Sequence, residues 1–433
     1  MSQGTEQQLV RAFGTLLLAA AVVNIIVGGG IFALPGSLAA SLGSAAPYAF
    51  VIGALLMLPV VVCFAAAGSR ATATGGPYSY GREAFGPFAG FVFGALTWIS
   101  NVTGCGGVAA ALVDQAARVF PALAHTGPRA VTLVLLFAAL IALNLRGVQL
   151  GARAIGALAA AKLLPLILLI GIGIWFIDPA NLEVPSWPAW SAFGSALVLV
   201  LFAYAGMESA LVPTGEVRDP SRTVPRAALT AILFVIALYV GLQVTAQGLL
   251  GASLAGDKTP LANAAGALWS GAFALLLVGA GISMLGYLHG NILGNSRLLY
   301  ALGRDQLLPA PLGRIQEKSR VPHVAIVVHG AVALGLALIG DFATLALVSG
   351  GAVGILYALI CLSAWRLQSR DQRGAGTPLR LPAGPLIPIV GVLAMLPILA
   401  SLTGAEWIAI GVALALSTAA YLAARAVARP HQS

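Results

Sequence analysis

The chain has 433 residues, of which 59% are hydrophobic and only 9% are charged. Soluble domains carry about 25% charged residues, so this composition excludes an ordinary soluble protein and predicts an all-α, polytopic membrane protein. The 23 lysines and arginines outnumber the 14 acidic residues. Their positions along the chain decide whether that excess points to a nucleic-acid partner or to a membrane orientation.

Twelve apolar segments are long enough to cross a bilayer. They lie near residues 12–41, 46–69, 88–116, 127–146, 152–177, 190–216, 225–250, 266–301, 323–340, 342–367, 384–402 and 405–427. The connections between them are short, so we expect a single transmembrane domain over residues 1–433. An even number of spans places both termini on the same side of the membrane.

The positions of lysine and arginine predict which side that is. With a cytoplasmic N-terminus, only Arg118, Arg129 and Lys258 fall on the opposite side, and Lys162 and Arg297 fall within spans. All other basic residues lie at the cytoplasmic face, as the positive-inside rule requires. We therefore expect a multi-pass protein of the cell inner (cytoplasmic) membrane with both termini cytoplasmic, and no nucleic-acid partner.

The first predicted span is interrupted by Gly28, Gly29 and Gly30, followed by Pro35. Glycine costs about 1 kcal/mol per helix position relative to alanine, so three in succession favour unwinding. Unwound backbone is tolerated at membrane depth only where protein or a watery cavity satisfies its polar groups. A broken span therefore predicts a binding site. The alternative is a glycine kink that allows close helix packing.

The sixth predicted span contains a second interruption, at residues 202–208 (FAYAGME). Spans one and six each begin a group of five, and because five is odd the second group is inverted relative to the first. We expect a first repeat over residues 12–177, an inverted second repeat over 190–367, and two additional helices over 384–427. Paired breaks in corresponding places of two halves are typical of a transporter site.

The ends of the half-helices predict what such a site binds. Free N–H groups near Gly29, Gly30 and Ile31 suit a carboxylate. Free carbonyl groups at residues 24–26 and 202–203 suit an ammonium group. Donors and acceptors that face one cavity match an α-amino acid zwitterion.

Two ionisable side chains within predicted spans are candidates for a functional role. Lys162 is about ten residues into the fifth span, roughly 15 Å from its cytoplasmic start, and an intramembrane charge is a functional hypothesis by default. It suits proton coupling or a fixed charge that replaces a metal cation; the structural alternative is a cation bonded to unwound carbonyls. Glu208 beside the second break is either a gating or protonation site or a carboxyl that caps free N–H groups of the half-helix.

Three stretches, in order along the chain, resemble the amino acid–polyamine–organocation (APC) superfamily of secondary transporters, of the bacterial amino acid permease type. Residues 24–35 (NIIVGGGIFALP) are similar to its first-helix motif. Residues 75–80 (GGPYSY) look like its loop between helices two and three. Residues 202–208, followed by 216–225 (EVRDPSRTVP), are similar to its most specific motif.

The resemblance implies a LeuT-like, five-plus-five inverted-repeat core that works by alternating access and is not an enzyme. It implies that Phe202 is an aromatic gate, that Ala205 sets the room for the side chain, and that Lys162 takes the place of a sodium ion. Transport is then sodium-independent and is either proton-coupled or an exchange. The expected substrate-binding residues are Ile26, Gly28, Gly29, Gly30, Ile31, Asn101, Phe202, Ala203, Ala205, Gly206 and Asn291, and the expected coupling and gating residues are Lys162, Glu208 and Phe202.

Two departures from the family pattern bear on the substrate. Gly29 stands where the family usually has serine, and Phe202 stands where some members have tryptophan. No intramembrane acid besides Glu208 is placed to neutralise a cationic side chain. We therefore expect a neutral amino acid, with a cationic amino acid or polyamine permease as the alternative.

A membrane-embedded enzyme and a channel belong to different classes, and neither fits the sequence. The chain has no HExxH or GxSxG motif and no cluster of acids, which a hydrolytic or metal-dependent site requires. It also lacks the charge rings of an ion pore. The expected partners are an amino acid, protons where transport is coupled to them, and the lipid bilayer, with no cofactor or metal, in a monomer or homodimer.

Overall fold

The computed structural model describes residues 14–70, 76–147, 152–210, 220–317, 319–373, 377–381 and 383–428, and every regular element in these ranges is a helix. The α-helices, in chain order, are α1 (Thr15–Ile26), α2 (Leu34–Leu42), α3 (Ala46–Arg70), α4 (Pro77–Phe85), α5 (Pro87–Ala116), α6 (Thr126–Leu145), α7 (Ala152–Gly173), α8 (Trp190–Tyr204), α9 (Met207–Ala210), α10 (Pro220–Leu250), α11 (Pro260–Leu268), α12 (Ser270–Arg304), α13 (His323–Ile339), α14 (Phe342–Ser369), α15 (Leu386–Ala400) and α16 (Gly404–Ala428).

Apolar helices of membrane-spanning length dominate the described part of the chain. Seven helical stretches there are long and apolar enough to cross a bilayer, among them α5, α12 and α14, and four shorter apolar helices accompany them. A helix rises 1.5 Å per residue, so about 20 residues cross the hydrocarbon core. The prediction of an all-helical, polytopic membrane protein is confirmed.

Two helix boundaries differ from the prediction. The sequence motif predicts a loop over residues 75–80, whereas α4 begins at Pro77, because the fixed φ of proline suits the first helical position. The predicted span over 266–301 is interrupted at Trp269, whose backbone is extended, so that α11 ends before it and α12 begins after it.

Two of the predicted spans are broken near the middle. The first, over residues 12–41, consists of α1, a short 3-10 helix η1 (Gly30–Phe32) and α2. The sixth, over residues 190–216, consists of α8 and α9. Residues 211–219, which include the start of the EVRDPSRTVP motif, lie outside the described residues.

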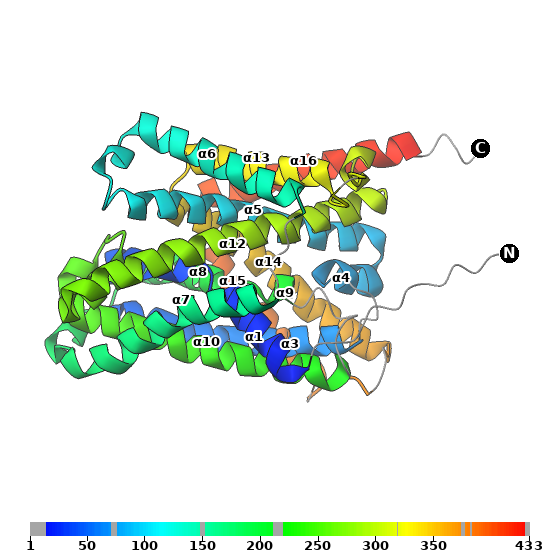
Figure 1. Ribbon diagram of the computed structural model, residues 1–433. Coiled ribbons are helices and arrows are strands. Elements are labelled where there is room, and N and C mark those ends of the chain that lie inside the picture. The colour runs from blue at the N-terminus through cyan, green and yellow to red at the C-terminus, as the bar shows by residue number, and fades with distance from the viewer. Residues whose placement is uncertain are drawn as a thin grey trace.

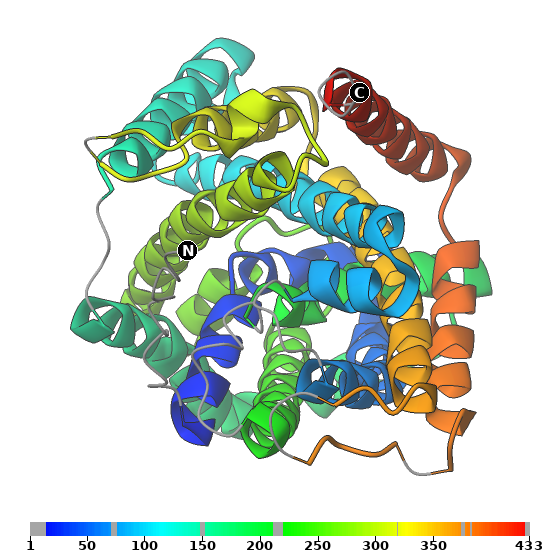
Figure 2. The ribbon, with the colours of Figure 1, turned by 90° about the vertical axis from the view of Figure 1, so that its right-hand side faces the viewer.

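The long helices run roughly along a common axis (Figure 1). In that view α6, α13 and α16 lie on one side of the bundle and α1, α3 and α10 on the other, with α5, α12 and α14 between them. Seen from the end, α16 stands at the edge of the bundle (Figure 2). Of the apolar segment in each helix, 83% is buried in α5 but only 11% in α16, so α5 belongs to the core and α16 leaves most of its apolar surface exposed.

Backbone contacts that only glycine allows bring these helices together. A Cβ atom at Gly350 on α14 would lie 2.5 Å from the carbonyl oxygen of Val198 on α8. A Cβ at Gly36 on α2 would lie 2.0 Å from the carbonyl oxygen of Asp257, and the Gly256 N–H donates to the Gly36 carbonyl at 3.0 Å. Small residues permit such approach between membrane helices. As a result, α2 is held directly against the connection between α10 and α11.

Candidate functional site

The first broken helix leaves three backbone donors unused. The Gly28 N–H bonds to the Ile26 carbonyl at 2.6 Å, and regular hydrogen bonding resumes with the N–H groups of Phe32 and Ala33. Within the described residues, the intervening N–H groups have no hydrogen-bond partner. These are the N–H groups of Gly29, Gly30 and Ile31.

Close side-chain contacts explain why this break is built from glycine. A Cβ at Gly28 would lie 2.7 Å from the Tyr287 ring, and a Cβ at Gly30 would lie 2.9 Å from the Phe202 ring. A Cβ at Gly29 would lie 2.3 Å from Cγ1 of Val108. Steric exclusion of a Cβ atom, and not an unusual φ angle, therefore favours glycine at all three positions. The absence of Cβ atoms allows two aromatic rings to pack directly against the unwound backbone.

Side chains from α7 and α10 bond the carbonyl groups of the first break. The buried Lys162 amino group donates to the carbonyls of Asn24 and Val27, the latter at 2.7 Å. The Tyr239 hydroxyl donates to the Ile26 carbonyl at 2.9 Å. Of the carbonyls expected to be free for a substrate ammonium, those of Asn24 and Ile26 are thus already bonded, and the Phe202 carbonyl accepts from the Ala205 N–H at 3.2 Å. The Ile25 carbonyl has no partner among the described residues.

At the second broken helix, a side chain bonds a backbone N–H group and not a carbonyl group. After α8 the backbone is extended at Ala205, and Gly206 has φ +130°, a value that favours glycine. The Gly206 N–H donates to Oε2 of Glu208 at 2.9 Å, and the Tyr357 hydroxyl donates to the same oxygen at 2.8 Å. The carboxyl caps the break, while the Ala203 carbonyl has no partner in the described part of the chain.

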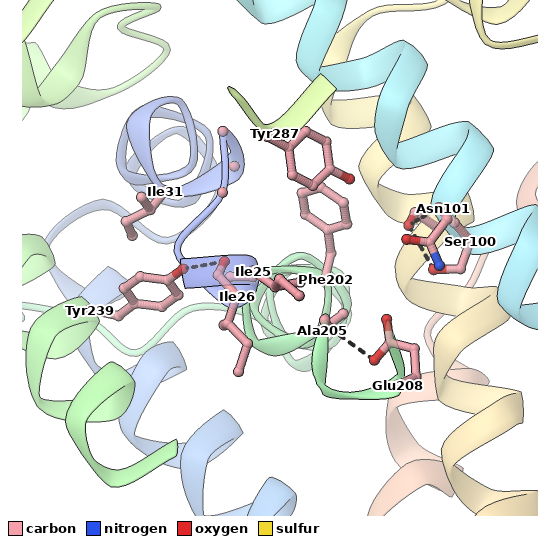
Figure 3. A pocket seen from close by; sticks show the side chains of 16 residues that line it. Ile25, Ile26, Ile31, Ser100, Asn101, Phe202, Ala205, Glu208, Tyr239 and Tyr287 are labelled. Atoms are coloured by element: carbon pink, nitrogen blue, oxygen red, sulfur yellow. Dashed lines mark hydrogen bonds between the residues drawn. The ribbon is translucent and has the colours of Figure 1, made fainter. Parts of the chain in front are cut away.

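Both breaks face one cavity, which Figure 3 shows from close by. Helices α5, α10, α12 and α14 complete its wall. The lining residues are Ile25, Ile26, Gly28, Gly29, Gly30, Ile31, Ser100, Asn101, Phe202, Ala203, Ala205, Gly206, Glu208, Tyr239, Tyr287 and Ser349.

Two of the predicted site residues do not line this cavity. Lys162 lies behind the first break and reaches only its carbonyl groups. Asn291 lies behind the wall, where its Nδ2 is 3.4 Å from Oδ1 of Asn101 and 3.2 Å from the Tyr287 hydroxyl. The structure therefore brings all the other predicted residues together around the cavity; Asn291 contacts two of the lining residues, whereas Lys162 bonds Asn24 and Val27, which do not line the cavity.

Several lining residues have no counterpart among the predicted ones. Tyr287 lies one helical turn before Asn291, a spacing that places both on one face of α12. Ser100 and Ser349 join α5 to α14, with their hydroxyl oxygens 3.0 Å apart. Helical spacing from Asn291 could have indicated Tyr287, whereas nothing in the sequence singles out Tyr239.

Phe202 lies at the centre of the cavity wall. Its ring contacts the backbone at Gly30, would be 3.1 Å from a Cβ at Gly104, and packs edge-to-face on Phe342 with ring centroids 6.0 Å apart. Figure 3 shows its ring next to that of Tyr287. Two rings from α8 and α12 thus border the space beside the unwound backbone.

Comparison with known proteins agrees with this geometry. The sequence pattern described as amino acid permease matches residues 13–424. An uncharacterized transporter of Mycobacterium tuberculosis is 32% identical over 92% of this chain and 89% of its own length. A serine/threonine exchanger of Bacillus subtilis is 25% identical over 95% of each chain. A methylthioribose transporter of the same organism is 24% identical over 97% of this chain and 94% of its own.

Proposed function

The chain belongs to the amino acid permease family, and on that premise we propose that it carries a neutral amino acid across the membrane by alternating access. It is a transporter and not an enzyme. The substrate binds between the two broken helices, Phe202 closes over it, and the broken helices rock to open the opposite side. Transport is independent of sodium and proceeds by proton coupling or by exchange.

One observation carries this proposal: the two breaks offer opposite free groups to one cavity. The first offers N–H groups at residues 29–31, and the second offers the Ala203 carbonyl. Free N–H groups at the start of a half-helix suit a carboxylate, and free carbonyls suit an ammonium group. An α-amino acid carries both on one carbon atom, so its zwitterion fits between them.

The bonding of Glu208 favours a neutral side chain over a cationic one. Its carboxyl group lines the cavity, but the Gly206 N–H and the Tyr357 hydroxyl already donate to it. A cationic amino acid or polyamine, the alternative substrate, would have to share this carboxyl group with the two donors, both of which bond Oε2. The similarity to a protein named as a serine/threonine exchanger supports the same choice.

The remaining expectations complete the proposal. We infer twelve spans with both termini cytoplasmic, repeats over residues 12–177 and 190–367 in opposite orientation, and two further helices over 384–427. Lys162 supplies a fixed positive charge to the carbonyls of the first break, in the place that a metal cation would take. This supports transport that needs no sodium.

Uptake into proteoliposomes tests the proposal. Labelled serine, threonine, alanine, leucine and lysine are offered separately, without sodium, with or without an inward proton gradient and with or without the same unlabelled amino acid inside. We expect saturable uptake of a neutral amino acid that needs either the gradient or the internal substrate. Preferential uptake of lysine would favour the cationic alternative, and an absolute need for sodium would contradict the role of Lys162.

A further inference from the structure

Five side chains from α5, α12 and α13 form one continuous set of hydrogen bonds that leads from behind the cavity wall to the cavity itself. Nε1 of Trp98 donates to Nδ1 of His329 at 3.1 Å, and Nε2 of His329 lies 2.9 Å from Oδ1 of Asn291. Asn291 in turn contacts Asn101 and Tyr287 through Nδ2. Asn101 and Tyr287 line the cavity, whereas His329 is fully buried.

Trp98 determines the direction of every bond in this network. An indole N–H can only donate, so Nδ1 of His329 accepts, and the neutral imidazole then carries its hydrogen on Nε2. That hydrogen is donated to Oδ1 of Asn291. The amide hydrogens of Asn291 are consequently the ones that face Asn101 and Tyr287. Donation runs from the half-buried indole of Trp98 towards the cavity.

The direction decides what the wall offers to a substrate. The Tyr287 hydroxyl oxygen accepts from Asn291, so its own hydrogen remains to be donated. Asn101 accepts through Oδ1 and gives one Nδ2 hydrogen to the Thr97 carbonyl at 2.8 Å. Its second Nδ2 hydrogen has no acceptor among the described residues. Two donors therefore border the cavity, and Figure 3 shows Tyr287 next to the Phe202 ring and Asn101 beside Ser100.

We propose that Trp98 and His329 are positioning residues that make this wall a donor surface, which selects neutral side chains bearing a hydrogen-bond acceptor such as a hydroxyl group. The inference rests on the proposed amino acid site and adds the feature of the side chain that is recognised. An ammonium or guanidinium group has only donors and cannot satisfy the wall. Without His329, the Asn291 amide is free to turn over and present its oxygen to Asn101 and Tyr287.

Threonine and valine are the probes that test this inference, because a hydroxyl group in one replaces a methyl group in the other. Initial rates of uptake into proteoliposomes give kcat/KM for each. We expect the unmodified protein to prefer threonine by about tenfold or more, since a buried donor left unpaired by valine is costly. Trp98→Phe and His329→Leu should lower that preference about fivefold or more, mainly by raising KM for threonine, while valine uptake is retained.

A conservative variant and a matched control separate positioning from folding. His329→Gln can both accept and donate, so it should recover part of the threonine preference. His289→Leu is the control. Like His329, His289 is a buried histidine paired with an asparagine: its ring lies 3.2 Å from Asn144, and among the described residues it bonds none of the five network residues. It should leave the ratio of threonine to valine unchanged.

Tyr287→Phe keeps the inference testable if Trp98→Phe and His329→Leu do not fold, because it removes only the hydroxyl at the end of the network. It should lower the threonine preference as well. Equal uptake of threonine and valine by the unmodified protein, or an unchanged ratio in folded Trp98→Phe and His329→Leu, would overturn the inference and leave amino acid transport standing. Absence of saturable uptake of any amino acid would instead overturn the proposed function on which it rests.

Discussion

The two broken helices solve the same problem with opposite chemistry. In the first, the Lys162 amino group bonds the carbonyls of Asn24 and Val27, and the N–H groups of residues 29–31 have no partner among the described residues. In the second, the Glu208 carboxyl bonds the Gly206 N–H, and the Ala203 carbonyl stays free. A cation from another helix stabilises one break, and an acid from within the break stabilises the other.

The difference shows how unwound backbone at membrane depth becomes useful. Unsatisfied backbone groups in an apolar environment cost several kcal/mol each, so the protein must bond most of them. Here side chains bond carbonyl groups at the first break and an N–H group at the second. The first break leaves three donors and the Ile25 carbonyl without a partner among the described residues, and the second leaves the Ala203 carbonyl, so donors and acceptors for a zwitterion lie around one cavity. Removing either stabilising charge should therefore disturb one break and spare the other.

Loss of Lys162 should have the largest effect. Lys162→Met retains an apolar stem but leaves the Asn24 and Val27 carbonyls without their donor. Hydrogen bonds to charged groups are worth about 1.5–3 kcal/mol, so we expect uptake of labelled substrate into proteoliposomes to fall about 100-fold. Lys258→Ala is the control, since that lysine is 65% exposed and pairs with Asp114. Uptake by Lys162→Met at the unmodified rate would mean that the first break needs no cation.

Glu208→Gln should have the next largest effect. An amide oxygen in the place of Oε2 can still accept from both the Gly206 N–H and the Tyr357 hydroxyl, but the negative charge is lost and an NH2 group replaces Oε1. We expect uptake to fall about tenfold to thirtyfold. Tyr357→Phe removes one donor and keeps the carboxyl, so it should have a smaller effect. A larger loss in Tyr357→Phe than in Glu208→Gln would show that the tyrosine, and not the acid, stabilises the second break.

The sequence predicts the two breaks well because each is a local property of the chain. Gly28–Gly30 and residues 202–208 mark them without knowledge of the fold, whereas the bond between Lys162 and the first break depends on how α7 packs against α1. The partners of the breaks are less predictable. Tyr239 and Ser349 reach the cavity only because α10 and α14 pack against the breaks, and a tyrosine or serine in an apolar helix carries no signal of that packing.

Gly29→Ser, which introduces the residue that the family usually has at this position, should have a tenfold effect on uptake. In Gly29→Ser, the new Cβ would lie 2.3 Å from Cγ1 of Val108, and overpacking costs about 1–3 kcal/mol. Val108→Ala removes that atom. We therefore expect Gly29→Ser to lower uptake about tenfold and the double variant to recover most of it. Equal loss in the single and double variants would mean that the serine hydroxyl, and not the contact with Val108, disturbs the first break.

The smallest effect should come from the Tyr239 hydroxyl. Tyr239→Phe removes its bond to the Ile26 carbonyl, but the Gly28 N–H still donates to that oxygen at 2.6 Å. Because the carbonyl keeps one partner, the loss should be near the lower end for a neutral hydrogen bond, about threefold in uptake. Tyr204→Phe is a matched control: its ring stacks on Tyr239, but its hydroxyl bonds the Phe50 carbonyl, away from both breaks. If Tyr239→Phe abolished uptake and Tyr204→Phe did not, the Tyr239 hydroxyl would stabilise the first break as strongly as Lys162 does. The first break would then depend equally on side chains from α7 and α10, and not mainly on the charge of Lys162.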